Sequence, residues 1–241
     1  MKRILTGLAD IVFPPQCLTC EEVLDPENNN TPLCPACFSA IHFIQPPLCP
    51  CCGIPFAGAG EDNHLCGECI LSKPLFSVAR AVGHYETKLL EAIHSFKYKG
   101  KISTGEALGK IMADFAYPAF HMAEYTLIIP VPLHSKRLRE RGFNQSLILA
   151  REISKKFHIP LDFLTLRRHM YTDAQINLGR KDREANVKGV FSVSESEKIQ
   201  GQRIILVDDV YTSGSTVREC TRTLMRNNAE SVAILTLART V

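Results

Sequence analysis

The stretch that decides the fold runs from Ile204 to Thr216 and reads IILVDDVYTSGST. Its four leading apolar residues predict a buried strand, which two adjacent acids, Asp208 and Asp209, follow. A short loop rich in glycine, serine and threonine comes next, and a helical pattern begins at Ser215. Ligands of open α/β sheets bind beyond the carboxyl ends of the strands, so this stretch predicts a ligand site.

The loop after the two acids has the chemistry of a phosphate site. A loop that opens a helix presents unpaired backbone N–H groups and the positive end of the helix dipole to an anion. Gly214 permits close approach of the backbone. Hydroxyl donors come from Thr212, Ser213, Ser215 and Thr216. The two acids would repel a phosphate, so their natural partners are neutral hydroxyls, and the stretch predicts a phosphorylated sugar. It lacks the Walker A spacing, and an ordinary helix cap is the alternative.

Strand and helix patterns alternate from residue 73 to the end of the chain. Apolar runs predict strands over 76–85, 125–131, 203–207 and 231–237. Helical spacing of apolar residues predicts helices over 89–96, 108–115, 146–157 and 215–227. This alternation predicts an α/β domain with a parallel sheet.

The segment before residue 73 differs, because it holds nine of the ten cysteines. Eight of them form C-x2-C pairs, and a shift of 32 residues maps the first two pairs onto the last two. The pairs are Cys17/Cys20, Cys34/Cys37, Cys49/Cys52 and Cys66/Cys69. Two such pairs supply the four thiolates of a structural zinc site, so the duplication predicts one zinc ion in each unit. We expect two domains: a tandem four-cysteine zinc ribbon at 1–72 and the α/β domain at 73–241.

Other assignments of the cysteines stay open at this point. The two units can also pair crosswise, and a disulfide framework is the alternative in an oxidising compartment. Cys51 has no counterpart in the repeat and is interpreted as a spectator. His64 lies two residues before Cys66 and is an alternative ligand. Cys220 falls in a predicted helix, where a small core residue is the simplest interpretation.

Charge divides the chain at about the same place as the cysteines. Residues 1–75 carry 3 Lys/Arg and 8 Asp/Glu, whereas residues 76–241 carry 25 and 17. A composition with 45% hydrophobic and 22% charged residues excludes collagen-like, coiled-coil and wholly disordered chains. No apolar run approaches the roughly 18 residues of a membrane span, and Pro14-Pro15 replaces the cleavage site of a secretory signal. We therefore expect a cytoplasmic protein without a membrane span.

VDDVYTSGST resembles the phosphoribosyl diphosphate (PRPP) signature of type I phosphoribosyltransferases. The whole chain resembles the competence protein ComF/ComFC family. The cysteine repeat, FKYKG at 96–100, VPLHSKRLRERGFNQ at 131–145 and the PRPP signature carry this resemblance, in that order. It implies a zinc ribbon joined to a type I phosphoribosyltransferase-like domain. In such a domain the two acids contact the ribose hydroxyls and the following loop holds the 5′-phosphate.

The same resemblance assigns two more segments to the site. In related transferases the loop after the first core strand binds pyrophosphate. It maps here to residues 133–137, where Lys136 and Arg137 supply positive charge. A loop that closes over the substrate maps to residues 168–189, which contain Thr172, Gln175, Arg180, Arg183 and Asn186. Mg²⁺ would arrive on the phosphates of PRPP if the domain is active.

The resemblance also implies a function in DNA uptake. The ComF/ComFC family is associated with natural transformation, in which single-stranded DNA enters the bacterial cytoplasm. We expect the chain to handle single-stranded DNA, to bind a PRPP-like ligand and to meet a helicase-like partner of uptake. Candidate nucleic-acid contacts are Arg139, Arg141, Arg180, Lys181 and Arg183. The alternative is an active phosphoribosyltransferase of nucleotide metabolism with an unknown acceptor, and catalytic turnover stays open.

Overall fold

A four-stranded parallel sheet forms the centre of the computed structural model, which describes residues 14–24, 32–58, 62–99, 102–172 and 186–241. The strands lie in the order β1 (Val78–His84), β6 (Ser231–Arg239), β5 (Arg203–Tyr211) and β2 (Leu127–Pro130). Every neighbouring pair is parallel. The predicted fold class, a parallel α/β sheet preceded by a four-cysteine repeat, is confirmed.

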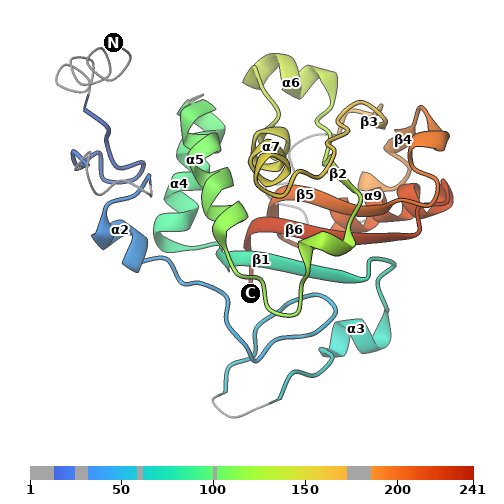
Figure 1. Ribbon diagram of the computed structural model, residues 1–241, viewed down its shortest axis with the longest axis horizontal. Helices are drawn as coiled ribbons and strands as arrows, with labels where there is room; N and C mark the ends of the chain where they lie inside the picture. Colours follow the sequence, from blue (N-terminus) through green and yellow to red (C-terminus); the bar gives the residue numbers. More distant parts are fainter. Residues whose placement is uncertain (1–13, 25–31, 59–61, 100–101, 173–185) are drawn as a thin grey trace.

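Helices cover both faces of this sheet. Alternate residues of a strand point to opposite faces, so Ile205 and Val207 of β5 face one side while Ile204 and Leu206 face the other. The first side is covered by α4 (Thr87–Lys99), α5 (Ile102–Asp114) and α7 (Gln145–Phe157), and the second by α9 (Ser215–Arg226). Figure 1 shows the first three helices together above the sheet.

The longer elements follow the predicted pattern, with one difference at the site. β5 continues to Tyr211 because its ladder with β6 runs on through Asp208 and Val210, so both acids lie inside the strand. Shorter elements were not predicted: η1 (Met122–Glu124), α6 (Ser135–Arg141), β3 (Leu166–Arg168), β4 (Phe191–Val193) and η2 (Ser196–Lys198). Since α6 begins at Ser135, the interpretation of residues 133–137 as a loop is wrong beyond His134.

The two cysteine units fold alike, as the duplication predicts. α2 (Pro35–Ser39) and α3 (Gly67–Leu71) begin and end 32 residues apart. The antiparallel bridges Gln16–Val23 and Leu48–Pro55 are related by the same shift. We call the described residues of 14–44 the first ribbon and those of 46–72 the second ribbon.

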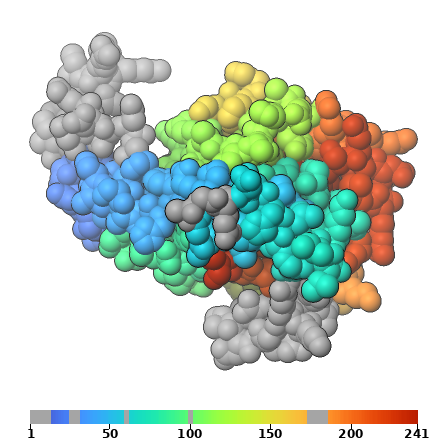
Figure 2. Space-filling model, turned by 90° about the horizontal axis from the view of Figure 1, so that it is seen from below, coloured from blue at the N-terminus to red at the C-terminus, as the bar shows by residue number. Residues whose placement is uncertain are grey.

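The ribbons pack directly on the α/β domain. Three cysteines of each ribbon are buried in an apolar cluster of the domain. Those of the first ribbon lie in the cluster of α4, α5 and α7, and those of the second in the cluster of α9. The ribbons therefore lie on opposite faces of the sheet. Figure 2 shows the chain from the first ribbon (blue) to the second (cyan) as a belt across one side of the molecule. The boundary near residue 73 stays a prediction.

Backbone from other segments covers both edges of the sheet. At β1, the N–H of Ile44 donates to Val82 O at 2.9 Å and the N–H of Ala79 donates to Cys51 O at 2.7 Å. At β2, Ile128 pairs with Leu161 in a short parallel bridge. In the part of the chain that the structure describes, no helix combines the length and the apolar character that a membrane span needs.

Candidate functional site

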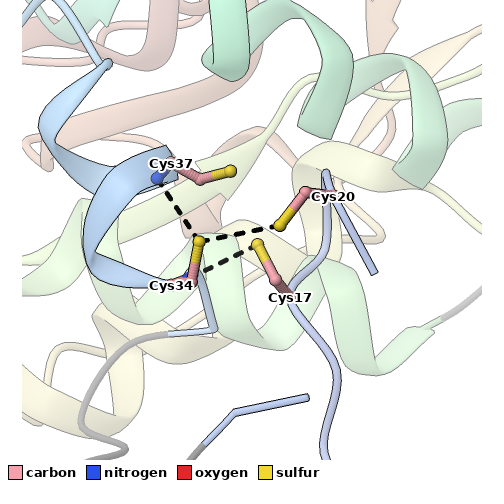
Figure 3. Close-up of side chains that lie close together, drawn as sticks. All are labelled: Cys17, Cys20, Cys34 and Cys37. Carbon is pink, nitrogen blue, oxygen red and sulfur yellow. Dashed lines mark hydrogen bonds between the residues drawn. The ribbon is translucent and has the colours of Figure 1, made fainter. Parts of the chain in front are cut away.

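The four sulfurs of the first ribbon converge on one point (Figure 3). The Sγ atoms of Cys20 and Cys34 are 3.6 Å apart, and the N–H of Cys34 donates to the Sγ of Cys17 at 3.3 Å. In the set Cys17, Cys20, Cys34 and Cys37, all sulfurs lie within 4.8 Å of one another. Four thiolates about 2.3 Å from a tetrahedral zinc ion would be about 3.8 Å apart, so this set fits Zn²⁺.

The second ribbon repeats this arrangement. The sulfurs of Cys52 and Cys66 are again 3.6 Å apart, and the N–H of Cys66 donates to the Sγ of Cys49 at 3.5 Å. Its set is Cys49, Cys52, Cys66 and Cys69. Because each set lies within one repeat unit, the crosswise alternative is wrong, and because all ten cysteines are free, so is the disulfide framework. Two four-cysteine clusters are thus present, with no open ligand position, as a structural zinc site requires.

Backbone hydrogen bonds prepare one thiol of each cluster for metal binding. Burial raises the pKa of Cys17, but hydrogen bonds led by the Cys20 N–H outweigh it and lower that pKa to about 6. The same competition lowers the pKa of Cys49 to about 7, chiefly through the N–H of Cys66. Both groups therefore populate the thiolate, the form that binds metal, near neutral pH.

Three further residues that could have been metal ligands, two cysteines and one histidine, lie outside the clusters. Cys51 belongs to neither four-sulfur set, as expected for a spectator. The ring of His64 stacks on Phe56 at 3.9 Å, and its Nδ1 meets Asp62 O at 2.9 Å, so its assignment as an alternative ligand is wrong. Cys220 is fully buried against the sheet, which confirms it as a core residue.

The two acids of β5 have different partners. Asp208 accepts hydrogen bonds at Oδ1 from the Ser146 hydroxyl (2.8 Å) and from the N–H of Asp209 (2.9 Å). Asp209 pairs instead with α4, where its Oδ2 lies 2.8 Å from Nζ of Lys97. Both side chains of that ion pair are mostly buried, at 17% exposed for Lys97 and 13% for Asp209. One carboxylate is therefore neutralised by a lysine, and the other is held by neutral donors.

Burial and the adjacent charge of Asp209 raise the pKa of Asp208 to about 7. An unfolded Asp titrates near 4, so ionising Asp208 in the fold lowers the free energy of unfolding as pH rises from about 4 to 7. We expect Asp208→Asn, which keeps an acceptor for Ser146, to raise that free energy by about 1–3 kcal/mol at pH 8 and by about half as much at pH 5.5. Urea unfolding of zinc-saturated protein at both pH values measures this.

The matched control for this prediction is Asp209→Asn. It removes the partner of Lys97 and leaves a mostly buried cation, so we expect it to destabilise the protein at pH 8. An Asp208→Asn variant that is less stable than the parent at pH 8 would contradict the prediction.

The loop from Thr212 to Thr216, which we call the phosphate loop, joins β5 to α9. Gly214 precedes the helix with φ of 75°, and a Cβ there would lie 2.4 Å from the hydroxyl of Tyr211, so glycine is required for conformation and for space. The hydroxyls of Ser213 and Ser215 are 2.7 Å apart. The N–H of Ser215 donates to the Ser213 hydroxyl at 3.4 Å and that of Arg218 to Gly214 O at 2.9 Å. The N–H groups of Thr216 and Val217 have no acceptor within their own helix, so they are available to an anion.

Positive side chains converge beside Asp208. The guanidinium of Arg168 donates to the Thr172 hydroxyl at 2.6 Å, and that of Arg137 donates to Thr172 O at 3.5 Å. Burial and the charge of Arg137 lower the pKa of Arg168, and the nearby charge of Asp208 partly opposes this shift. Within the described part of the chain, the buried Nε–H of Arg168 has no hydrogen-bond partner. Two guanidiniums held this close indicate a place for an anion.

The predicted nucleic-acid contacts fall in two groups. Arg139 and Arg141 lie in the last turn of α6, and the guanidinium of Arg141 lies 5.8 Å from the ring centre of Tyr98 on α4. Nζ of Lys136 lies 4.2 Å from the ring centre of Tyr171. Arg180, Lys181 and Arg183, together with Gln175, lie outside the described residues.

Sequence reasoning missed two residues of the site. Lys97 was present in the quoted FKYKG motif, but nothing in a helical pattern indicates which surface lysine reaches a strand. Ser146 opens the predicted helix at 146–157, and its contact with Asp208 depends on how α7 packs against β5. The predicted residues from Asp208 to Thr216 lie at the carboxyl end of β5 and the start of α9.

Family models match both parts of the chain. A double zinc ribbon domain matches residues 8–70, and a phosphoribosyl transferase domain matches residues 144–240. These matches agree with the two four-cysteine clusters and with the parallel sheet that carries the phosphate loop.

Similar proteins cover most of the chain. It is 32% identical over 212 residues to the DNA utilization protein YhgH of Salmonella typhi, covering 87% of this chain and 91% of that protein. It is 31% identical over 228 residues to competence protein F of Haemophilus influenzae, covering 93% and 96%. Identity to competence protein ComFC of Bacillus subtilis is 28% over 217 residues, covering 86% and 84%. The chain therefore belongs to the ComF/ComFC family, in which a double zinc ribbon precedes a phosphoribosyltransferase domain.

Proposed function

We propose that this protein acts in DNA uptake or utilization by handling single-stranded DNA in the cytoplasm, and that its α/β domain binds PRPP or a related phosphoribosyl ligand. The names of its relatives, which are competence proteins and a DNA utilization protein, support the first part. The second part depends on one observation: two carboxylates near the end of β5 are followed by a short loop whose Gly214 leads directly into α9.

The arrangement of charges supports a ligand with a ribose between two phosphate groups. Asp208 and Asp209 offer acceptors to neutral hydroxyls, and the phosphate loop offers N–H and hydroxyl donors to a 5′-phosphate. Arg137 and Arg168, which both donate to Thr172, would hold the pyrophosphate, with Lys136 nearby on α6. Mg²⁺ would accompany the pyrophosphate of PRPP, since it prefers phosphate oxygens and water to dedicated protein cages.

The surface of α6 supports contact with single-stranded DNA. Its arginines supply charge for backbone phosphates, and Tyr98, which is 72% exposed, presents a ring on which a base can stack. Lys136 of α6 lies over a second ring, that of Tyr171. Cations beside exposed rings are the combination that binds single strands without strong sequence preference.

The experiment is binding of the zinc-loaded protein to a labelled oligothymidylate of about 30 nucleotides, at several salt concentrations, with and without PRPP and Mg²⁺. We expect Arg139→Gln/Arg141→Gln to weaken binding about tenfold and to reduce the salt slope by about 1.4, because each phosphate contact contributes about 0.7. Calorimetric titration of PRPP in the same samples measures ligand binding separately.

The matched control is Lys110→Gln/Arg226→Gln, which removes two exposed charges from α5 and α9, away from α6. Equal loss of affinity in both double variants would contradict the α6 surface. Absence of PRPP binding at millimolar concentration with Mg²⁺ would contradict the ligand site and leave the DNA result to be judged on its own.

A second candidate function is catalysis by the same site, favoured because the acid pair and the phosphate loop occur together. A nucleophile would bond to C1 of the ribose while the C–O bond to pyrophosphate breaks, and pyrophosphate would leave with the electron pair. The guanidiniums near Asp208 would stabilise that leaving charge. Release of pyrophosphate from PRPP that depends on added DNA or nucleobase measures this activity, and PRPP that binds without turnover would contradict it.

We also propose that the helicase-like partner of uptake contacts the second ribbon. Ile70 and Leu71 of α3 are 66% and 88% exposed, and Leu75 close by is 56% exposed. Large exposed apolar side chains that lie close together are typical of protein-binding surfaces. Capture of such a helicase by the parent but not by Leu71→Glu would support this contact, and equal capture would contradict it.

A further inference from the structure

The second ribbon contacts the start of α9 through an ion pair. Glu68 lies in α3 between two cysteines of the cluster, and its Oε1 is 2.5 Å from Nη2 of Arg218. Arg218 is in the first turn of α9, where its N–H donates to Gly214 O at 2.9 Å. The Arg218 side chain is only 16% exposed, so the ion pair is sheltered from solvent on one side. Arg218 thus links the second cluster to the start of α9.

A second connection runs through Arg239 and Tyr211. Arg239, the last residue of β6, donates from Nη1 to the carbonyl oxygen of Cys52, a residue of the second cluster. Its guanidinium also lies 4.9 Å from the ring centre of Tyr211. The Tyr211 ring in turn fills the space beside Gly214, which is the reason no Cβ fits there. Tyr211 therefore packs between the second cluster and the phosphate loop.

The first ribbon makes its contacts elsewhere. Nδ1 of His42 lies 2.6 Å from Glu86, and the hydroxyl of Thr87 donates to Ala40 O at 3.0 Å. These residues are at the amino end of α4, and both members of the His42–Glu86 pair are at least half exposed. The first ribbon thus provides an internal comparison, with the same four-cysteine geometry on a different part of the sheet.

We propose that the second ribbon, and not the first, holds the phosphate loop in its binding conformation, with Arg218, Arg239 and Tyr211 as positioning residues. The inference rests on the proposed function, because it takes this loop as the site for a phosphate. Coupling between two sites is reciprocal: if the filled second cluster favours ligand binding, the ligand must favour metal retention by that cluster by the same factor. The first cluster serves as the unaffected reference.

The first experiment measures the zinc affinity of each cluster in the full-length protein by equilibrium competition with a coloured chelator. The variants Cys34→Ser and Cys66→Ser assign the two affinities, since each destroys one cluster. We expect saturating PRPP with Mg²⁺ to raise the zinc affinity of the second cluster at least fivefold and to leave that of the first unchanged. Glu68→Gln, which keeps every cysteine, should remove most of this increase, whereas Glu86→Gln should not. An equal increase at both clusters, or none although PRPP binds, would overturn the inference.

The second experiment uses no ligand, so it decides the inference even if PRPP does not bind. Hydrogen exchange of the amides of 212–218 is compared in zinc-loaded parent, Glu68→Gln, Cys66→Ser and Cys34→Ser. We expect exchange of this segment to rise about tenfold in Cys66→Ser, less in Glu68→Gln, and to stay at the parent level in Cys34→Ser. Exchange that is the same in all four proteins would overturn the proposal. Failure of PRPP binding alone would instead contradict the proposed ligand.

Discussion

Replacing Cys34 by serine is expected to leave one zinc ion per chain and to lower the free energy of unfolding by about 3 kcal/mol or more. Structural zinc contributes of the order of 10–16 kcal/mol of binding free energy to the folding of small ribbons, so loss of one ligand removes a large share of that. Cys34 links its cluster in two ways, since its N–H donates to Cys17 and its Sγ accepts the N–H of Cys37. Elemental analysis and urea unfolding measure the two effects.

The control for this prediction is Cys51→Ser. Cys51 is also a cysteine of the ribbons, but it lies outside both four-sulfur sets, so zinc content should remain two per chain. Loss of zinc in Cys51→Ser, or two bound zinc ions in Cys34→Ser, would contradict the assignment of ligands.

Gly214→Ala has the second large effect that we expect, because two penalties coincide at this position. The residue has φ of 75°, which L-amino acids other than glycine adopt at a cost of about 1–2 kcal/mol. In addition, the new Cβ would lie 2.4 Å from Oη and 2.6 Å from Cζ of Tyr211, so the ring or the loop must move. We expect a loss of about 2–4 kcal/mol in the free energy of unfolding and at least a tenfold loss of PRPP affinity, measured by urea unfolding and calorimetric titration.

Gly201→Ala separates the two penalties. Gly201 has a similar φ of 71°, but nothing lies within 4 Å of the position its Cβ would take. Gly201→Ala should therefore lower the free energy of unfolding only by the cost of the left-handed backbone, about 1–2 kcal/mol, and leave PRPP affinity unchanged. If Gly214→Ala behaves like Gly201→Ala in both measurements, then Tyr211 does not constrain the phosphate loop.

The parts of the structure that repeat or alternate were the ones that the sequence predicted well. A shift of 32 residues in the cysteines reappears as paired helices and bridges, because the same local hydrogen bonds form in both units. The strands and the longer helices follow from apolar runs and helical spacing, since burial on the sheet selects those patterns. The acids and the phosphate loop adjoin in sequence, so their proximity needed no tertiary information.

Features that depend on packing between distant segments were not predictable in this way. α6 is a local exception: its one apolar residue, Leu138, gives no helical pattern, and the helix is fixed by the cap at His134 and the left-handed Gly142. Lys97 looks like any lysine of a surface helix until α4 lies against the sheet and brings its Nζ to Asp209. The ribbons similarly have no core of their own, because units of this size bury too little apolar surface without the sheet beneath them.

The backbone contacts along β1 have a further consequence for how the protein behaves among other copies of itself. An uncovered outer strand offers unpaired N–H and C=O groups and invites another chain to extend the sheet. Here residues 42–44 and Cys51 already occupy hydrogen-bonding positions along β1, and Leu161 does the same at β2. The ribbon segments at β1 and the segment of Leu161 at β2 thus cover both outer strands, so we expect the sheet not to extend by pairing with a second copy of the chain.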